Sequence, residues 1–183
     1  IKSRNLIRAM RLFLNLSKEE KNRAYEKMRE IDLSRTPEDI ERCRNLRGPL
    51  MECVEELKGM EIYIDPFVYG IAPALLDVES RGIPDAKNEK SGAIGLGQLL
   101  PSTAEEIISK IGIDTSNIEE KLKDPKINMK LSLLYLDRLY KLFPDLAVAV
   151  WACHLGEGNM MNVIRAYFGR GDVVLAGEGY KTS

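Results

Sequence analysis

Apolar residues recur at helical spacing along most of this chain. Between positions 129 and 143 they stand at i, i+4, i+7, i+11 and i+14, as Met129, Leu133, Leu136, Tyr140 and Phe143. This spacing predicts one buried face on a helix that starts at DPKIN, residues 124–128. The segment 145–155 is apolar on nearly all sides, which indicates a central buried helix. The glycines of GEGN then predict a break before a further helix at MMNVIRAYFGRGD.

The N-terminal third also predicts helices. Residues 4–60 are charged, nearly free of β-branched runs and apolar at helical spacing, so we expect three short helices there. One of them has a defined start, because Thr36 suits the N-cap and Pro37 suits the first helical position. The acidic Glu38 and Asp39 follow in the first turn, where the helix dipole favours negative charge.

A connector divides the chain into two parts. In GMEIYIDPF, residues 59–67, apolar and polar residues alternate only briefly before a proline, which favours a connector over a strand. We therefore predict an N-terminal helical extension, residues 1–62, and one larger domain, residues 63–183. The 183-residue chain, with 44% hydrophobic residues, is long enough to bury a core of this kind.

The polar segment between two predicted helices holds the candidate chemistry. VYGIAPALLDVES predicts a helix that ends at the Glu79–Ser80 pair, and the next helix starts at Pro101 and runs to about residue 111. A carboxyl group at the end of an apolar helix is partly desolvated, which raises its pKa toward the range of a general acid. Gly92, Gly95 and Gly97 allow a close approach of the backbone, and together with the amide of Gln98 they suit an uncharged polar ligand such as a sugar. Spacing alone does not distinguish this site from a solvated glutamate beside an ordinary glycine-rich loop.

Composition excludes several classes of partner. The 27 basic and 28 acidic residues leave a formal net charge of −1, so we expect no attraction to nucleic acid or to an anionic membrane. The longest apolar run, residues 66–78, contains two prolines and a glycine and is shorter than the roughly 20 residues of a membrane helix. The chain starts at Ile1, and no signal peptide or membrane anchor is visible in it, so these residues leave export open.

The cysteines and the single histidine are candidates for a disulfide, a nucleophilic pair and a metal site. Cys43 and Cys53 lie five residues on either side of Gly48, so two antiparallel helices joined there would bring them together, although two small core residues explain them equally well. Cys153 and His154 are adjacent in a helix and point in different directions, which argues against a nucleophilic pair. With one histidine and no zinc-type cysteine spacing, we expect no metal and no cofactor.

Four ordered motifs resemble the lytic transglycosylase SLT family, whose lysozyme-like domain is related to goose-type lysozyme. They are ES at 79–80, GAIGLGQLLPSTA at 92–104, DPKINMKLSLLYL at 124–136 and LAVAVWACHLGEGN at 146–159. The family has an ES, a GLMQLMP-x-TA, a DP-x-x-N with a following YL, and an AYN-x-G-x-G in that order. The resemblance covers about residues 66–168 and implies a mainly α, lysozyme-like domain behind the N-terminal helical extension.

This resemblance implies an activity and a set of site residues. Glu79 matches the glutamate that protonates the β-1,4 bond between N-acetylmuramic acid and N-acetylglucosamine and then acts as a base, which forms 1,6-anhydromuramic ends. The implied partner is the peptidoglycan glycan strand, which places the protein outside the cytoplasm, in the periplasm or cell envelope. The implied substrate-binding residues are Ser80, Gly97, Gln98, Tyr135, His154 and Glu89.

The chain departs from the family pattern at several positions. Gly97 stands where many members have methionine, which predicts extra space beside the cleft, and Cys153 and His154 replace the tyrosine and asparagine of AYN. We interpret His154 as a hydrogen-bonded replacement for that asparagine that contacts sugar or backbone. Family members carry a groove tyrosine downstream, and both Tyr180 and a residue beyond Ser183 are candidates for it.

These departures keep two alternatives open. An extra carboxylate at Glu89 could activate water and produce a hydrolytic muramidase. The altered AYN motif is also compatible with a glycan-binding envelope protein that has no catalytic activity.

Overall fold

The computed structural model describes residues 36–111, 114, 116–168, 173–176 and 179–182, together with Glu19. Side chains are described for Glu19 and for residues 36–109, 114 and 116–162. The elements are α3 (Pro37–Asn45), α4 (Arg47–Gly59), α5 (Pro66–Ser80), α6 (Pro101–Ile111), α7 (Ile118–Lys123), α8 (Pro125–Leu142), α9 (Leu146–Leu155), α10 (Glu157–Phe168), β1 (Val173–Ala176) and β2 (Gly179–Thr182). The predicted mainly α fold is confirmed, and the helices expected before Thr36 lie outside the described residues.

Three helices start in the same way, with a capping side chain followed by proline. At α3 the Thr36 hydroxyl accepts a hydrogen bond from the Asp39 N–H, and the Asp39 carboxylate accepts one from the Thr36 N–H, both at 3.2 Å. Asp65 caps α5 by accepting from the N–H of Phe67 at 2.8 Å, and Asp124 caps α8 in the same manner. These caps satisfy N–H groups that have no partner inside the helix, so the local sequence determines where each helix starts.

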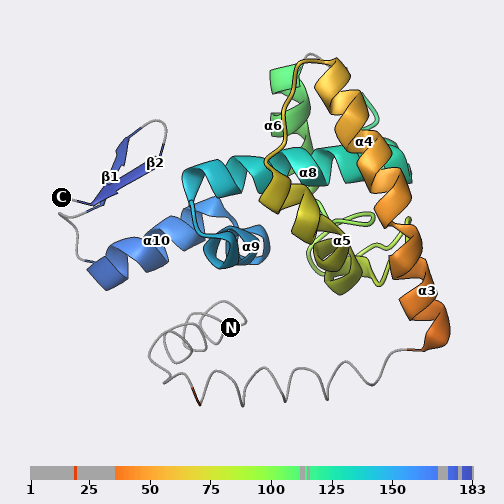
Figure 1. The fold of residues 1–183 in the computed structure, drawn as a ribbon, viewed down its shortest axis with the longest axis horizontal. Coiled ribbons are helices and arrows are strands. Elements are labelled where there is room, and N and C mark those ends of the chain that lie inside the picture. Colours follow the sequence, from red (N-terminus) through yellow and green to blue (C-terminus); the bar gives the residue numbers. More distant parts are fainter. Residues whose placement is uncertain are drawn as a thin grey trace.

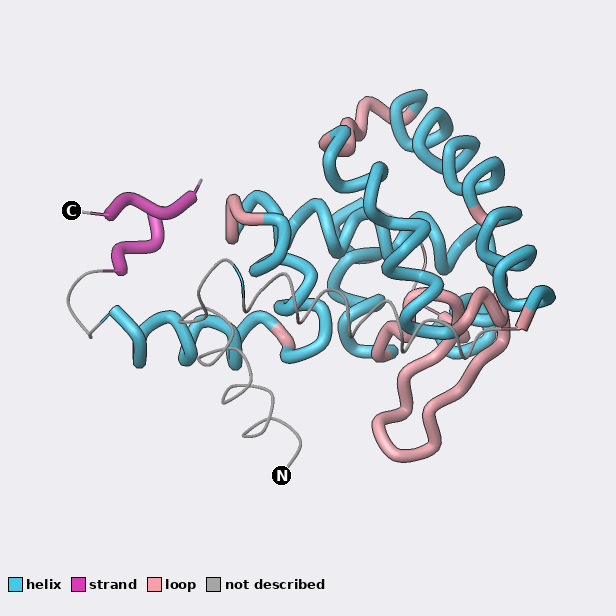
Figure 2. The backbone as a smooth tube through the Cα atoms, turned by 60° about the horizontal axis from the view of Figure 1, so that its bottom comes forward, coloured by secondary structure: helices cyan, strands magenta, loops and turns pink. Residues whose placement is uncertain are grey.

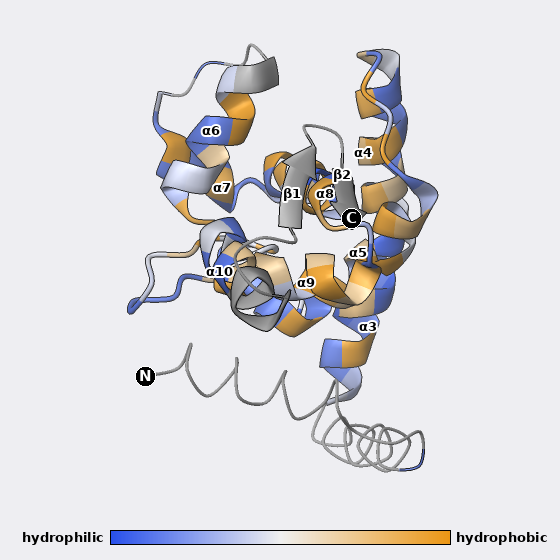
Figure 3. Cartoon of the chain, turned by 90° about the vertical axis from the view of Figure 1, so that its left-hand side faces the viewer, coloured by the Kyte–Doolittle hydropathy of each residue, from blue (hydrophilic) through white to orange (hydrophobic). Residues whose placement is uncertain are grey.

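The main core is built around α8, which crosses the middle of the molecule (Figure 1). The predicted stripe is confirmed: its members are buried, except for Tyr140, which is half-buried. Helix α4 also contributes to this core, and the apolar sides of α4, α5, α8 and α9 meet there through Leu50, Leu57, Val68, Leu76, Leu133, Leu136, Ala149 and Ala152. In Figure 3, α3 and α4 show hydrophobic residues on one side and hydrophilic residues on the other. The boundary between residues 62 and 63 stays a prediction.

Helix α9 differs from its prediction as a central buried helix. Its buried residues are Ala149, Ala152 and Leu155, all on one side, whereas Ala147 and His154 are exposed. Helix α9 packs against α8 on that side. Its C-terminal end borders a cleft. The break after α9 is also shorter than predicted, because α10 starts at Glu157, directly after Gly156.

A second apolar cluster joins the loop before α6 to the helices α6, α7 and α8. Its buried members are Ile94, Leu99, Ala104, Ile107, Ile108, Ile118, Leu122 and Leu131. Leu131 lies on α8, so α8 contributes to both clusters. The long loop between α5 and α6, which projects from the helices as a pink tube in Figure 2, is therefore anchored at its base.

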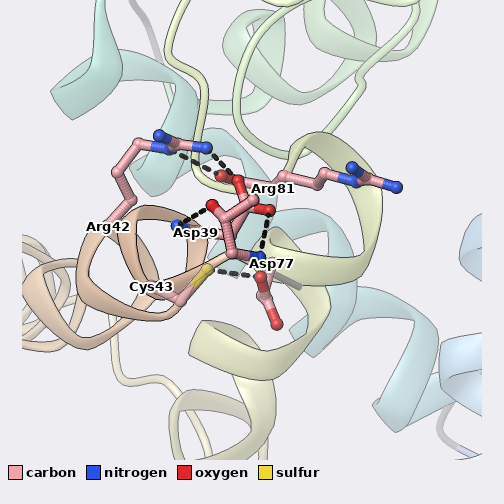
Figure 4. Close-up of polar contacts among 6 residues, drawn as sticks. Asp39, Arg42, Cys43, Asp77 and Arg81 are labelled. Atoms are coloured by element: carbon pink, nitrogen blue, oxygen red, sulfur yellow. Dashed lines mark hydrogen bonds and ion pairs between the residues drawn. The ribbon is translucent and has the colours of Figure 1, made fainter. Parts of the chain in front are cut away.

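Helix α3 contacts the C-terminal end of α5 through polar groups (Figure 4). The Arg42 Nε donates to the Arg81 carbonyl at 3.2 Å, and Arg42 also pairs with Asp39. The Cys43 thiol donates to the Asp77 carboxylate. These bonds connect α3 to the last turn of α5.

Cys43 and Cys53 are free thiols, so the disulfide alternative is wrong. Leu46, between α3 and α4, keeps right-handed helical dihedral angles, with φ −70° and ψ −26°. The chain therefore continues from α3 into α4 without turning back, as Figure 1 shows, and the two cysteines do not face each other. Cys53 is fully buried in the main core.

The chain ends in a β-hairpin that the hydrophobic pattern does not predict. β1 pairs with β2 in antiparallel register from Val173 opposite Thr182 to Ala176 opposite Gly179, and Tyr180 lies opposite Leu175. The Tyr180 side chain lies outside the described part of the chain. Within that part, no helix combines the length and the apolarity that crossing a bilayer requires.

Candidate active site

Glu79 lies in the last turn of α5 and borders a cleft of about 590 Å³. The helix ends there because Arg81 and Gly82 adopt left-handed backbone angles, with φ of 54° and 70°. The cleft is bounded by α5, by the loop from Asn88 to Leu100, by α6 and α8, and by the end of α9. Its volume is in the range of small-molecule sites, and its lining mixes apolar side chains with a few polar groups.

The Glu79 carboxyl is largely withdrawn from water. Its side chain is only 16% exposed, and this burial raises its pKa, with His154 acting in the opposite direction. A raised pKa keeps more of the carboxyl protonated near neutral pH, which is what a general acid requires. This upward shift of the Glu79 pKa agrees with the prediction made from the position of Glu79 at the end of an apolar helix.

His154 comes from α9 and meets Glu79 directly. Its Nδ1 lies 3.0 Å from Oε1 of Glu79, within hydrogen-bonding distance. We expected this histidine to contact sugar or backbone, and sequence reasoning missed its pairing with the catalytic candidate. No local spacing signals this contact, because the two residues lie on separate helices and only the packing of α5 and α9 brings them together.

The loop beside Glu79 is held in shape by its own backbone. The Ile94 and Leu99 backbones exchange two hydrogen bonds, of 2.9 and 3.1 Å, across a tight turn. Gln98 has a left-handed backbone, with φ 47°, and its Nε2 donates to the carbonyls of Ala86 and Gly95, both at 3.0 Å. Gln98 lines the cleft as expected, but its amide N–H groups stabilise the loop, which leaves Oε1 as its acceptor group.

Asn128 on α8 locks this turn against the helices. Its Nδ2 donates to the carbonyls of Ile94 at 3.0 Å and Leu122 at 2.9 Å, and its Oδ1 accepts from the N–H of Gly97 at 2.8 Å. The side chain is fully buried, and its two bonds from Nδ2 form away from water. The DPKIN motif contains this asparagine, but sequence reasoning gave it no role. Its helical spacing of three residues from the apolar Leu131 is the signal that could have marked it as buried.

Gly97 does not open extra space beside the cleft, so that prediction is wrong. A Cβ atom at this position would lie 1.9 Å from the Ser132 Oγ and 2.9 Å from the Ser132 Cβ. Ser132 on α8 therefore occupies the volume that a larger side chain at position 97 would need. Glycine allows the loop and α8 to approach this closely, and both residues line the cleft.

Of the remaining candidate residues, some line the cleft and others lie outside it. Tyr135 on α8 lines the cleft, and burial raises its pKa to about 12. Ser80 is buried outside the lining, and its hydroxyl donates to the Leu76 carbonyl at 3.0 Å. Glu89 is exposed in the loop, and the structure does not bring it to the cleft lining. Cys153 lines the cleft, but burial raises its pKa to about 12, which keeps its thiol protonated.

In the described part of the chain, the fold and the site together define a helical domain with one buried carboxylic acid at the edge of a cleft of about 590 Å³. Comparison with known proteins identifies the family: the model of the transglycosylase SLT domain matches residues 67–173, more than half of the chain. The chain belongs to this family. A search of the curated proteins found no match. Membership indicates lytic-transglycosylase-type activity on peptidoglycan, and therefore action outside the cytoplasm.

Proposed function

We propose that this protein is a lytic transglycosylase that cleaves the β-1,4 bond between N-acetylmuramic acid and N-acetylglucosamine, with Glu79 as the acid and the base. The observation that carries the proposal is the buried Glu79 carboxyl with a raised pKa at the edge of the cleft. A single group of this kind can serve both steps of the reaction.

In the first step, Glu79 donates its proton to the glycosidic oxygen as the bond from that oxygen to C1 of the muramic residue breaks. The 2-acetamido group of the same residue stabilises the positive charge that develops at C1. In the second step, the 6-hydroxyl oxygen bonds to C1, and the Glu79 carboxylate accepts the hydroxyl proton. The products are a free 4-hydroxyl and a 1,6-anhydro ring, and Glu79 is protonated again.

The lining of the cleft supports cyclisation over hydrolysis. Among the described residues that line it, Glu79 is the one carboxylic acid. A hydrolase of the inverting type needs a second carboxylate about 6.5–9.5 Å away to activate water. Glu89, the candidate for that role, is exposed and absent from the lining.

The test is a digest of purified peptidoglycan with the wild type, Glu79→Gln and Glu89→Gln, followed by mass spectrometry of the released muropeptides. We expect anhydromuramic ends from the wild type and from Glu89→Gln, and no release from Glu79→Gln. Glu89→Gln is the matched control, because it makes the same carboxyl-to-amide change outside the cleft.

Each other outcome has its own meaning. Reducing muramic ends that disappear in Glu89→Gln would refute the transglycosylase and establish the muramidase. Binding to peptidoglycan without release by the wild type would refute catalysis and support the glycan-binding alternative.

A further inference from the structure

The Glu79 carboxyl has two oxygens, and a general acid needs one of them free for the substrate. In the structure, Oε1 lies 3.0 Å from Nδ1 of His154. Among the described residues, His154 is the one side chain that forms a hydrogen bond or ion pair with this carboxyl. The contact therefore distinguishes the two oxygens and leaves Oε2 available.

In the part of the chain that the structure describes, few titratable groups surround Glu79. Tyr135 on α8 and Cys153 on α9 line the same cleft, and burial raises the pKa of each to about 12, so both are neutral at pH 7. Lys90 lines the cleft from the exposed part of the loop. A histidine ring is the ordinary side chain that gains or loses charge near neutral pH, and its neutral form can donate from Nδ1.

We propose that His154 is a positioning residue for the acid: its Nδ1–H donates to Oε1 of Glu79 and leaves Oε2 to carry the proton that the glycosidic oxygen receives. This inference rests on the proposed function, in which Glu79 is the acid. His154 stands where the family motif has asparagine, whose amide N–H could make the same donation but cannot become charged near neutral pH.

The bond from His154 gains strength as the reaction proceeds. Glu79 is neutral before it gives up its proton and negatively charged afterwards, in a position where burial disfavours charge. A hydrogen bond to a carboxylate is about twice as strong as one to a neutral carboxyl. The donation therefore stabilises the transition state more than the bound substrate, which predicts an effect on kcat and little on KM.

The kinetic test compares His154→Leu with His154→Asn on a soluble glycan-strand fragment. The two replacements have nearly the same shape, and Asn places an N–H donor at the branch position where histidine has Nδ1. We expect His154→Leu to lose about 10- to 100-fold in kcat with KM nearly unchanged, which is the equivalent of one charge-assisted hydrogen bond. His154→Asn should recover most of this loss.

The pH profile adds a second criterion. A donor beside Glu79 favours its carboxylate form, so the pKa of Glu79 should be higher in His154→Leu, which has no donor, than in His154→Asn. The alkaline limb of kcat/KM should therefore lie at higher pH in His154→Leu than in His154→Asn, since a raised pKa keeps the acid protonated to higher pH. Circular dichroism and thermal melts of both variants verify that they are folded.

A nitrogen NMR measurement tests the contact without any substrate. The chain contains one histidine, so the two ring-nitrogen signals belong to His154. With the imidazole neutral and the Glu79 carboxyl ionised, we expect the ring hydrogen on Nδ1 in the wild type, and we expect this preference to disappear in Glu79→Ala. A hydrogen on Nε2 in both proteins would overturn the inference.

Failure of the inference and failure of the proposed function differ. If the wild type releases anhydro ends, Glu79→Gln does not, and His154→Leu has wild-type kcat, the inference is wrong and the function stands. A higher KM with unchanged kcat in His154→Leu would likewise overturn it and would make His154 a sugar-binding residue. If the wild type releases nothing, the proposed function and the positioning role both fail.

Discussion

The close approach between Gly97 and Ser132 predicts that the loop does not tolerate a side chain at position 97. In Gly97→Ala, the new methyl group would lie 1.9 Å from the Ser132 Oγ and 2.9 Å from the Ser132 Cβ. Rotation of the serine hydroxyl can relieve the first contact. The second persists in every rotamer, because the Cβ position is determined by the backbone of α8.

The loop therefore has to move, but its own bonds resist. The Gly97 N–H donates to the fully buried Asn128 at 2.8 Å, so a shift of the loop backbone lengthens this bond. Overpacking of a well-packed site costs about 1–3 kcal/mol. Because both the contact and the hydrogen bond are affected, we expect a loss in the upper half of that range, about 2–3 kcal/mol in the free energy of unfolding.

Urea unfolding followed by circular dichroism measures this change. Gly70→Ala is the matched control, because it adds the same methyl group to α5 at a position with nothing within 4 Å. There we expect a gain of up to about 1 kcal/mol from the higher helix propensity of alanine. A Gly97→Ala variant within about 0.5 kcal/mol of the wild type, the range of neutral surface substitutions, would refute the reasoning.

Three further predictions concern the same region. Asn128→Ala should lower the free energy of unfolding by at least about 2 kcal/mol, because it leaves the Gly97 N–H and the buried Leu122 carbonyl without a partner and removes one of the two bonds to the Ile94 carbonyl; a urea-derived loss below about 1 kcal/mol would contradict this. Burial raises the folded-state pKa of Glu79 above its unfolded value, so its contribution to stability is lost as pH rises through the folded pKa. Glu79→Gln should therefore be more stable than the wild type at pH 8, and this difference should shrink toward pH 4. Urea unfolding at both pH values measures the difference, and a wild type that is the more stable protein at pH 8 would contradict the prediction. Since burial raises the pKa of Cys153 to about 12, iodoacetamide at pH 8 should label this thiol only after unfolding. Mass spectrometry that shows rapid labelling of Cys153 in the native protein would contradict this prediction.

Local sequence was sufficient for the helices and for the main candidate. The Thr36 and Asp124 caps, each followed by proline, determine where two helices begin, and these starts are where the pattern predicts them. The stripe on α8 follows from the 3.6-residue period, which holds whatever the helix packs against. The position of Glu79 at the end of an apolar helix likewise predicted the direction of its pKa shift, since burial raises that pKa in the structure.

Only the tertiary structure decided which side chains meet. Periodicity shows that a helix face is buried, but it does not show what that face contacts. The pairing of His154 with Glu79, the contact of Gly97 with Ser132 and the bonds from Asn128 to the loop each join segments far apart in the sequence. Their geometry depends on where α8 and α9 cross α5 and the loop, and those crossings result from the packing of the whole core. The sequence alone therefore indicated the candidate acid, whereas the packing of the helices decided which groups surround it.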